Sequence, residues 1–256
     1  MYTVIIPFFN QQNYVSDTMK SVLSATCYDD EIVVIDDCST DSTYLELIKF
    51  NYDPRVKVFK NIENMGHVKT LNKAARIAKG EVLVLLGGDD LLGNGFCQWL
   101  SPHFSNGADI VFSPVEFFEN ISDVNTNKIS KVSTIPLGFM DILFGWGKAK
   151  QRKYSIIGCA IRKTSFEFLE GFSEDVLIED HDLFIRASQK KLKILSVGGS
   201  YSFYRKSSGS LSSNMRRMII EDFRIIEKNV TFPLSFLAKL RRVVSFTAVY
   251  LRGKLF

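Results

Sequence analysis

The chain of 256 residues has little of what marks disulfide-rich, membrane-spanning or secreted proteins. No run approaches the ~18 uninterrupted apolar residues of a spanning helix. The opening residues lack the basic segment and the long apolar core of a signal peptide. Its few cysteines form no C-x-x-C pair, which suits reduced thiols better than a disulfide framework or a zinc site. They are Cys27, Cys38, Cys97 and Cys159. We therefore expect a cytoplasmic globular protein.

Acidic residues are absent from the last part of the chain. The last one is Glu227, and six basic residues follow it among apolar and aromatic ones: Lys228, Lys239, Arg241, Arg242, Arg252 and Lys254. This segment could lie on an anionic membrane surface, or it could pack against the rest of the protein. No nucleic-acid-binding pattern accompanies it, so we expect no nucleic-acid partner.

Apolar β-branched runs alternate with helical patterns over the first 90 residues. Strands are predicted at 2–7, from 31 to a break at 36, at 56–61 and from 81, with helices at 13–25, after Asp41, and at 67–78. This alternation is typical of right-handed βαβ units. It predicts an α/β fold with a mostly parallel central sheet flanked by helices.

The second half of the chain is less regular. Its pattern predicts strands within 108–119 and at 156–161, a loop at 122–131 and a helix at 179–189. Helices are also predicted from residue 216 onward, with a break at Pro233.

Polar groups follow three of the predicted strands: Pro7 to Asn10, Asp36–Asp37 and Asp89–Asp90. Ligands of open parallel sheets bind beyond the carboxyl ends of the strands, so these groups are expected to meet. Clustered carboxylates repel each other unless a cation offsets them, and Mg²⁺ or Mn²⁺ usually also holds phosphates. Each aspartate alone could be a turn former or a helix cap. Three groups on one edge favour a site.

The motifs VIIPFFN, VVIDDCSTDST, NMGHVKTLNKA and GEVLVLLGGDDLL, in this order, resemble the family 2 glycosyltransferases with the GT-A fold. GFSEDVLIEDHDLFIRA and YRKSSGSLS resemble the later motifs of that family. The resemblance covers residues 2–213. It implies a catalytic domain at 1–213, with a nucleotide-sugar-binding half at 1–100 and an acceptor-binding half at 101–213. Residues 214–256 would be a basic and aromatic helical extension.

This resemblance implies a nucleotide-sugar donor, commonly a UDP-sugar. Asp37 would accept a hydrogen bond from the uracil edge, and Asp41 would hold the turn. Lys69 would offset diphosphate charge, unless it is an ordinary solvated lysine. The full set of implied donor contacts is Pro7, Phe9, Asn10, Asp37, Asn64, Gly66, Lys69, Gly88, Asp89, Asp90 and Arg205.

Two positions depart from the family pattern. Gly87 stands where the family has the first aspartate of Asp-x-Asp, which leaves Asp89 as the predicted ligand of Mn²⁺ or Mg²⁺. Ser207 stands where the family has a late histidine. The metal would then be weakly held, or be coordinated mainly by the diphosphate. The same departures support an alternative, a non-catalytic nucleotide-sugar-binding module.

For catalysis, the resemblance implies Asp180 as the general base, with Glu179 as a helper. Acidic residues in a first helical turn can also simply complement the helix dipole. Trp146 would stack on an acceptor sugar or belong to the core. His181 would face the acceptor or be structural.

The expected reaction is an inverting transfer of a sugar from the nucleotide to a hydroxyl. The acceptor would be a glycan or a polyprenyl-diphosphate-linked sugar of a bacterial O-antigen or capsule. The enzyme would work at the inner face of the plasma membrane, with peripheral contact through the basic segment. A nucleotidyltransferase is a more distant alternative, because VIIPFFNQQNY offers no glycine-rich phosphate loop after the first strand.

Overall fold

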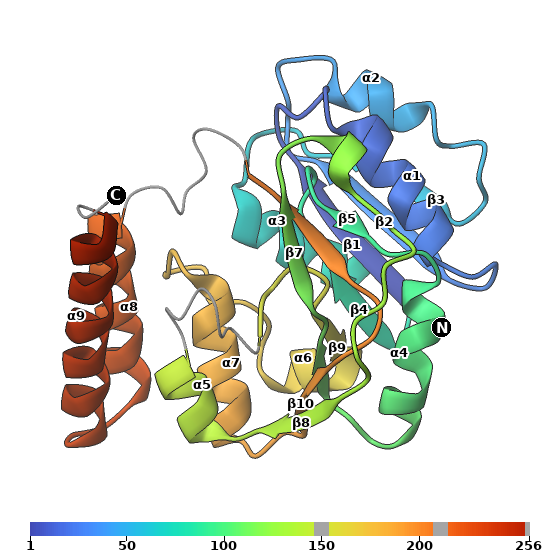
Figure 1. Cartoon of the computed structure of the whole chain (residues 1–256). Coiled ribbons are helices and arrows are strands. Elements are labelled where there is room, and N and C mark those ends of the chain that lie inside the picture. Colours follow the sequence, from blue (N-terminus) through green and yellow to red (C-terminus); the bar gives the residue numbers. More distant parts are fainter. Residues whose placement is uncertain (146–153, 207–214, 254–256) are drawn as a thin grey trace.

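The computed structural model describes residues 1–145, 154–206 and 215–253 (Figure 1). The elements of its first half follow the predicted alternation. They are β1 (Tyr2–Phe8), α1 (Val15–Ala25), β2 (Glu31–Asp36), α2 (Thr43–Ile48), β3 (Val56–Lys60), α3 (His67–Ile77), β4 (Val82–Leu85), β5 (Leu91–Leu92) and α4 (Phe96–Ser105).

The second half contains shorter strands and the helices that follow them. They are β6 (Ile110–Phe112), β7 (Val115–Phe118), a 3₁₀ turn (Ile121–Asp123), β8 (Thr134–Leu137), α5 (Phe139–Gly145), β9 (Ala160–Arg162), α6 (Lys163–Phe168), α7 (Glu179–Gln189), β10 (Ile194–Val197), β11 (Ser202–Arg205), α8 (Met215–Asn229) and α9 (Leu234–Gly253). Helix α7 has the bounds that its sequence predicts. The break between α8 and α9 falls at Pro233, also as predicted.

Among the described residues, the large sheet has eight strands in the order β3-β2-β1-β4-β9-β6-β10-β8. Strands β3, β2, β1 and β4 are parallel neighbours. Strand β9 runs antiparallel to β4 and β6, β10 is parallel to β6, and β8 is antiparallel to β10. The prediction of a mostly parallel sheet is confirmed. The strand order reverses beside β1, so the ligand crevice of such a sheet is expected beyond the ends of β1 and β4.

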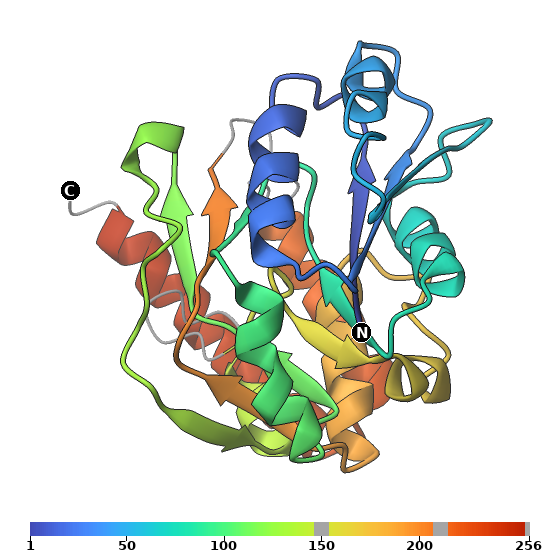
Figure 2. The ribbon, with the colours of Figure 1, turned by 90° about the vertical axis from the view of Figure 1, so that its right-hand side faces the viewer.

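Helices cover both faces of the sheet because its central strands are apolar on both sides. Side chains alternate between faces along a strand. In β1, Val4 and Ile6 belong to the apolar cluster that includes residues of α1, α2 and α4, whereas Ile5 belongs to the cluster that includes residues of α3, α5, α6, α7 and α8. Figure 2 shows α1 and α4 in front of the sheet, and the C-terminal helices behind it.

The predicted strand at 156–161 is wrong at its start, because β9 begins only at Ala160. Gly158 lies in a turn with φ of 67°, and its N–H donates to the Leu85 carbonyl at 2.9 Å. A Cβ at this position would lie 2.6 Å from the Cβ of Ser202. The backbone approaches its neighbours so closely that only glycine fits, and this approach interrupts the strand.

Strand β11 belongs to a separate small sheet, in the order β5-β11-β7. It pairs antiparallel to β5 and parallel to β7. Strand β5 directly follows the turn after β4. The pairing therefore brings the end of β11 beside that turn.

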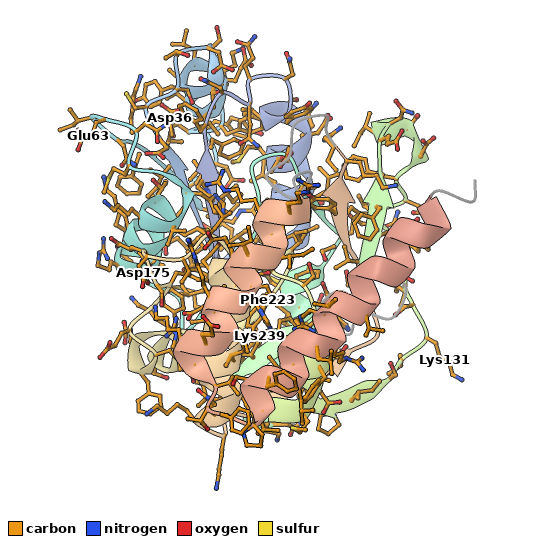
Figure 3. All side chains as sticks on the ribbon, turned by 90° about the vertical axis from the view of Figure 1, so that its left-hand side faces the viewer. Asp36, Glu63, Lys131, Asp175, Phe223 and Lys239 are labelled. Atoms are coloured by element: carbon orange, nitrogen blue, oxygen red, sulfur yellow. The ribbon has the colours of Figure 1, made fainter. Side chains whose placement is uncertain are left out.

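The C-terminal helices α8 and α9 lie side by side over the face formed by α5 and α7 (Figure 3). Ile225, Ile226 and Ala238 are buried in the same apolar cluster as the sheet. Basic side chains of the extension take part in this packing. Arg242 pairs with Asp222, Lys239 pairs with Glu227, and Arg241 donates to the Phe144 carbonyl. The described part of this segment packs against the rest of the protein, and its contact with a membrane stays a prediction.

The exposed side of α9 still carries apolar side chains: Phe236, Leu237, Leu240, Val243 and Val244. None of the helices in the described residues has the length and apolar character required to cross a bilayer.

Candidate active site

The chain leaves β1 through a turn that is tied to the loop after β2. Pro7 is buried inside the strand, whereas Phe9 is 44% exposed at its end. Asn10 has φ of 51°, a left-handed conformation that asparagine adopts more readily than most residues. Its N–H donates to Ser39 Oγ at 2.9 Å, and its Oδ1 accepts from the Thr40 N–H at 2.8 Å. These residues lie at the carboxyl edge of the sheet, and their contact with a nucleobase stays a prediction.

Asp37, the first residue after β2, is buried and organises the segment that leads into α3. Its Oδ1 accepts from the Asn61 amide at 2.8 Å and from the Met65 N–H at 2.9 Å. Its Oδ2 accepts from the Gly66 N–H at 2.9 Å. Because a carboxylate oxygen has two lone pairs, Oδ2 can accept one more donor, such as a nucleobase N–H. The uracil contact stays a prediction.

The residues around Gly66 prepare the start of α3. Gly66 has φ of 84°, which costs glycine nothing, and its N–H also donates to Asn64 Oδ1 at 2.9 Å. Lys69 lies exposed in the first turn of the helix. Both alternatives for Lys69, a diphosphate contact and a solvated surface lysine, are consistent with this position.

The turn after β4 gives a physical reason for glycine at position 87. A Cβ on Gly87 would lie 2.6 Å from Asp90 Oδ2, so the Asp90 carboxyl occupies the space of a side chain there. A Cβ on Gly88 would meet Gln11 Oε1 and would lie 2.6 Å from the Phe8 ring. Both glycines therefore allow the backbone of this turn to lie close to the side chains of Asp90, Gln11 and Phe8.

Arg205, at the end of β11, holds this turn. Its backbone N–H donates to Asp90 Oδ1 at 3.0 Å, and its Nε donates to the Asp89 carbonyl at 2.9 Å. The guanidinium also reaches Asp17 Oδ2 at 3.2 Å and lies 4.5 Å from the Phe118 ring centre. Arg205 is 8% exposed and is engaged by protein groups. The direct donor contacts predicted for Arg205 and Asp90 stay predictions.

The two aspartates of this turn are poorly hydrated. Burial raises the pKa of Asp89. Burial, and then the negative charge of Asp89, raise the pKa of Asp90 to about 8. A cation near Asp89 would favour the ionised forms of both groups.

In the part of the chain described here, no group of three or more His, Cys, Asp or Glu side chains could hold a metal ion. Mg²⁺ commonly binds through one or two carboxylates together with substrate phosphates and water. The single Asp89 carboxylate therefore fits an ion that is held mainly by a diphosphate. Ser207, the other position of interest for the metal, lies outside the described residues.

Helix α7 brings Glu179 and Asp180 to the start of α3. His67 Nε2 lies 3.7 Å from Glu179 Oε1. Burial, and then the charge of Asp180, raise the pKa of Glu179 to about 8. Desolvation lowers the pKa of His67, opposed by the charges of Asp37 and Asp180. The His67 side chain is nevertheless 47% exposed, so water reaches the imidazole.

Asp180 also lies near the end of β4. Burial raises the pKa of the Cys159 thiol, and the charge of Asp180 raises it further. The Cys159 carbonyl accepts from the N–H of Leu85, the last residue of β4, at 2.8 Å. The glycine turn that carries Asp89 follows at once. Asp180 therefore acts on the strand end from which the turn with Asp89 starts, and the convergence of Asp37, Asp89 and Asp180 on one cleft stays a prediction.

Of the two residues predicted to contact an acceptor, the structure describes only His181. His181 has no exposed surface, and its Nδ1 lies 2.7 Å from Asp222 Oδ1 of α8. The assignment of His181 as an acceptor contact is wrong for this structure, because the α7 helix turns the imidazole toward the protein interior. Trp146 lies outside the described residues.

Sequence reasoning missed His67 as a residue of the site. The available signal was its place in the sequence. His67 directly follows the Asn64-Met65-Gly66 motif and is the first residue of a helix, which would have placed it beside the predicted donor contacts. Only the tertiary structure, which brings the start of α7 to the start of α3, shows that His67 faces Glu179.

The chain matches the model of glycosyl transferase family 2 over residues 3–169. It belongs to this family. The chain is therefore a glycosyltransferase, as its motifs predict.

Similar proteins agree with this assignment. A relative from Escherichia coli, "UDP-Glc:alpha-D-GlcNAc-diphosphoundecaprenol beta-1,3-glucosyltransferase WfaP", is 25% identical over 241 residues, which cover 89% of this chain and 86% of the relative. Among solved structures, S. aureus TarS 1–349 in complex with UDP-GlcNAc has a TM-score of 0.68 at 18% identity, covering 96% of this chain and 72% of that 1–349 chain.

A second solved structure is the mannosyltransferase PcManGT from Pyrobaculum calidifontis in complex with GDP-Man and Mn²⁺. It has a TM-score of 0.65 at 17% identity and covers 98% of this chain and 75% of PcManGT. The structural likenesses show the fold alone. With the family match, they confirm that this glycosyltransferase has the GT-A fold.

Proposed function

We propose that this family 2 glycosyltransferase transfers a hexose from a UDP-sugar, with inversion, to a hydroxyl of a polyprenyl-diphosphate-linked acceptor. The product would belong to a bacterial surface polysaccharide such as an O-antigen or capsule. The observation that carries the proposal is the 3.7 Å approach of Glu179 to His67, which brings the acidic turn of α7 to the start of α3, directly after the segment that Asp37 holds.

The E. coli relative supports the choice of substrates. Its name gives UDP-Glc as the donor, a diphosphoundecaprenol-linked sugar as the acceptor and a beta-1,3 linkage. UDP-glucose is an α-glycoside, so a β-linked product corresponds to inversion. A lipid-linked acceptor would also bring the enzyme to the inner face of the plasma membrane without any spanning segment.

In this mechanism, Asp180 accepts the proton of the acceptor hydroxyl while its oxygen attacks the anomeric carbon. The bond between that carbon and the diphosphate oxygen breaks, and UDP leaves with the bonding electrons. Glu179, whose pKa is about 8, keeps its proton at neutral pH. The pair then carries one negative charge, which avoids repulsion between two adjacent carboxylates.

Donor binding would use the residues at the ends of β1, β2 and β4. Asp37 Oδ2 would accept a hydrogen bond from the uracil N–H, and the turn at Asn10 would line the base. Arg205 would fix the turn that carries Asp89. A divalent ion, when bound, offsets the charge of the departing diphosphate, and Asp89 is the residue that would hold it.

The experiment is transfer from a panel of UDP- and GDP-sugars to a synthetic GlcNAc-diphosphate-lipid, with Mn²⁺ or Mg²⁺. Mass spectrometry identifies the product, and the anomeric proton coupling in NMR gives its configuration. We expect one UDP-hexose to react with a β-linked product. Asp180→Asn should lower the rate by about 10²- to 10⁴-fold. The matched control is Asp175→Asn, an exposed aspartate paired with Lys228, which should transfer at the normal rate.

The alternative is a binding module without turnover. Donor binding without transfer for every sugar, together with equal behaviour of Asp180→Asn and the unmodified chain, would replace the proposal with that alternative. An α-linked product would refute the inverting mechanism alone.

A further inference from the structure

A fully buried ionic cluster connects the start of α7 to the C-terminal helices. Asp222 of α8 places Oδ1 at 2.7 Å from His181 Nδ1, and its Oδ2 accepts from Arg242 Nε of α9 at 2.7 Å. Arg242 also donates to the Leu143 carbonyl in α5 at 2.8 Å. The side chains of Asp222, His181 and Arg242 are at most 1% exposed. Three helices therefore meet at one carboxylate, and Arg242 links a fourth, α5, to the cluster.

A second contact joins α8 to the same turn of α7. Asp182, also fully buried, accepts from Asn229 Nδ2 of α8 at 2.9 Å. Its other oxygen accepts from Ser173 Oγ at 2.6 Å and from Arg186 Nε at 2.7 Å. The Asn229 carbonyl in turn accepts from Gln189 Nε2 at 2.6 Å. Helix α8 thus holds both ends of α7.

These contacts fix the direction of the residues that precede them. Successive side chains on a helix are about 100° apart, so holding His181 and Asp182 in the interior sets the rotation of the whole first turn. Glu179 and Asp180 belong to that turn. A buried carboxylate such as Asp222 also tolerates few alternative arrangements, because it must keep its partners.

We propose that α8 is a positioning element for the catalytic pair, with Asp222 and Asn229 fixing the first turn of α7 and hence the place of Asp180 in the crevice. This inference rests on the proposed function of Asp180. It makes the C-terminal helices part of the active-site scaffold.

Three variants of α8 test the inference. Asp222→Asn removes the charge of the cluster, and Asn229→Ala removes the contact with Asp182 while it leaves the cluster intact. Arg224→Ala is the matched control, because Arg224 pairs with Glu221 on the exposed face of the same helix. A misplacement of about 1 Å can cost roughly 10²-fold in rate. We therefore expect the first two variants to lose about 10- to 100-fold in kcat, with the KM for the UDP-sugar within about twofold. Arg224→Ala should retain kcat.

Combination with Asp180→Asn separates positioning from a general loss of structure. If α8 acts through Asp180, then Asn229→Ala has little further effect on the residual rate once Asp180 is replaced. The same fold loss in both backgrounds would overturn the inference. So would a folded Asn229→Ala protein with unchanged kcat. If Asp222→Asn does not fold, Asn229→Ala alone decides.

A measurement without turnover distinguishes this inference from the proposed function. The carboxyl of Glu179 can be titrated by ¹³C NMR in the unmodified chain and in Asn229→Ala. The groups that act on it are Asp180 of its own turn and His67 of α3. Loosening the turn should hydrate the pair and move the Glu179 titration toward that of an ordinary glutamate. An unchanged titration would overturn the inference, whereas absence of transfer by the unmodified chain would overturn the proposed function instead.

Discussion

Replacing Glu179 by glutamine should change how the stability of the enzyme depends on pH. Glu179 is 14% exposed and lies beside Asp180. Glutamine keeps the shape of the protonated carboxyl and cannot ionise. The difference between Glu179→Gln and the unmodified chain therefore isolates the titration of this one group, because His67 and Asp90 titrate in both proteins.

The sign of the effect follows from the two pKa values. The pKa of Glu179 rises from 4.5 to about 8 in the folded protein. Between these values the folded chain holds a proton that the unfolded chain releases, so the free energy of unfolding falls as pH rises through this range. One pKa unit corresponds to about 1.4 kcal/mol, which sets an upper limit of roughly 5 kcal/mol. Water that enters the site when Glu179 ionises would stabilise the charged form and make the change in the free energy of unfolding smaller. We take about 2 kcal/mol as the lower limit of this change.

Urea unfolding at pH 5, 7 and 9 measures the effect. We expect the free energy of unfolding of the unmodified chain to fall by about 2 to 4 kcal/mol relative to Glu179→Gln between pH 5 and pH 9. Glu167→Gln is the control, because Glu167 is 61% exposed, and its curve should follow that of the unmodified chain. Parallel curves for Glu179→Gln and the unmodified chain would refute the reasoning, since they would mean that Glu179 releases its proton equally readily in both states.

Three further predictions concern the turn after β4. Gly87→Asp, which restores the aspartate of the family, should destabilise the protein by about 1 to 3 kcal/mol in urea unfolding, because its Cβ would lie 2.6 Å from Asp90 Oδ2; an unchanged midpoint would contradict this. Arg205→Ala should lower the free energy of unfolding by about 3 kcal/mol or more in the same assay. It removes a guanidinium that is 8% exposed and that bonds to Asp17 and to the Asp89 carbonyl. A decrease below about 1 kcal/mol would show that these contacts contribute little to stability. Chelation of metal should weaken UDP-sugar binding by about tenfold or more in calorimetry, and Asp89→Asn should reproduce this; equal affinities with and without Mn²⁺ would argue against the predicted ion.

The sequence was sufficient where the physical signal is local. The apolar runs of β1, β2 and β4 each break at a polar or glycine-containing turn, so both the strands and the groups at their carboxyl ends could be predicted. The glycine before α3 and the acidic first turn of α7 gave the starts of those helices in the same way. Helix α4 was not predicted, and Pro102 within it weakens the usual helical pattern.

The sequence was insufficient where a residue's role depends on what packs against it. Gly158 was predicted inside a strand, yet Ser202 and Ser113 come so close that it forms a turn. His181 was a candidate acceptor contact, yet Asp222 holds it in the interior. The residues that contact Gly158 and His181 are far from them in the sequence, so no local pattern could reveal these contacts.

By itself, then, the chain determined the family, the alternation of strands and helices, and the carboxylates that end the parallel strands, since burial period and turn chemistry act over a few residues. The tertiary structure alone decided that His67 faces Glu179, that Asp90 fills the space above Gly87, and that α8 holds the first turn of α7. Those pairings depend on how whole elements pack, and many sequences with the same local patterns would pair them differently.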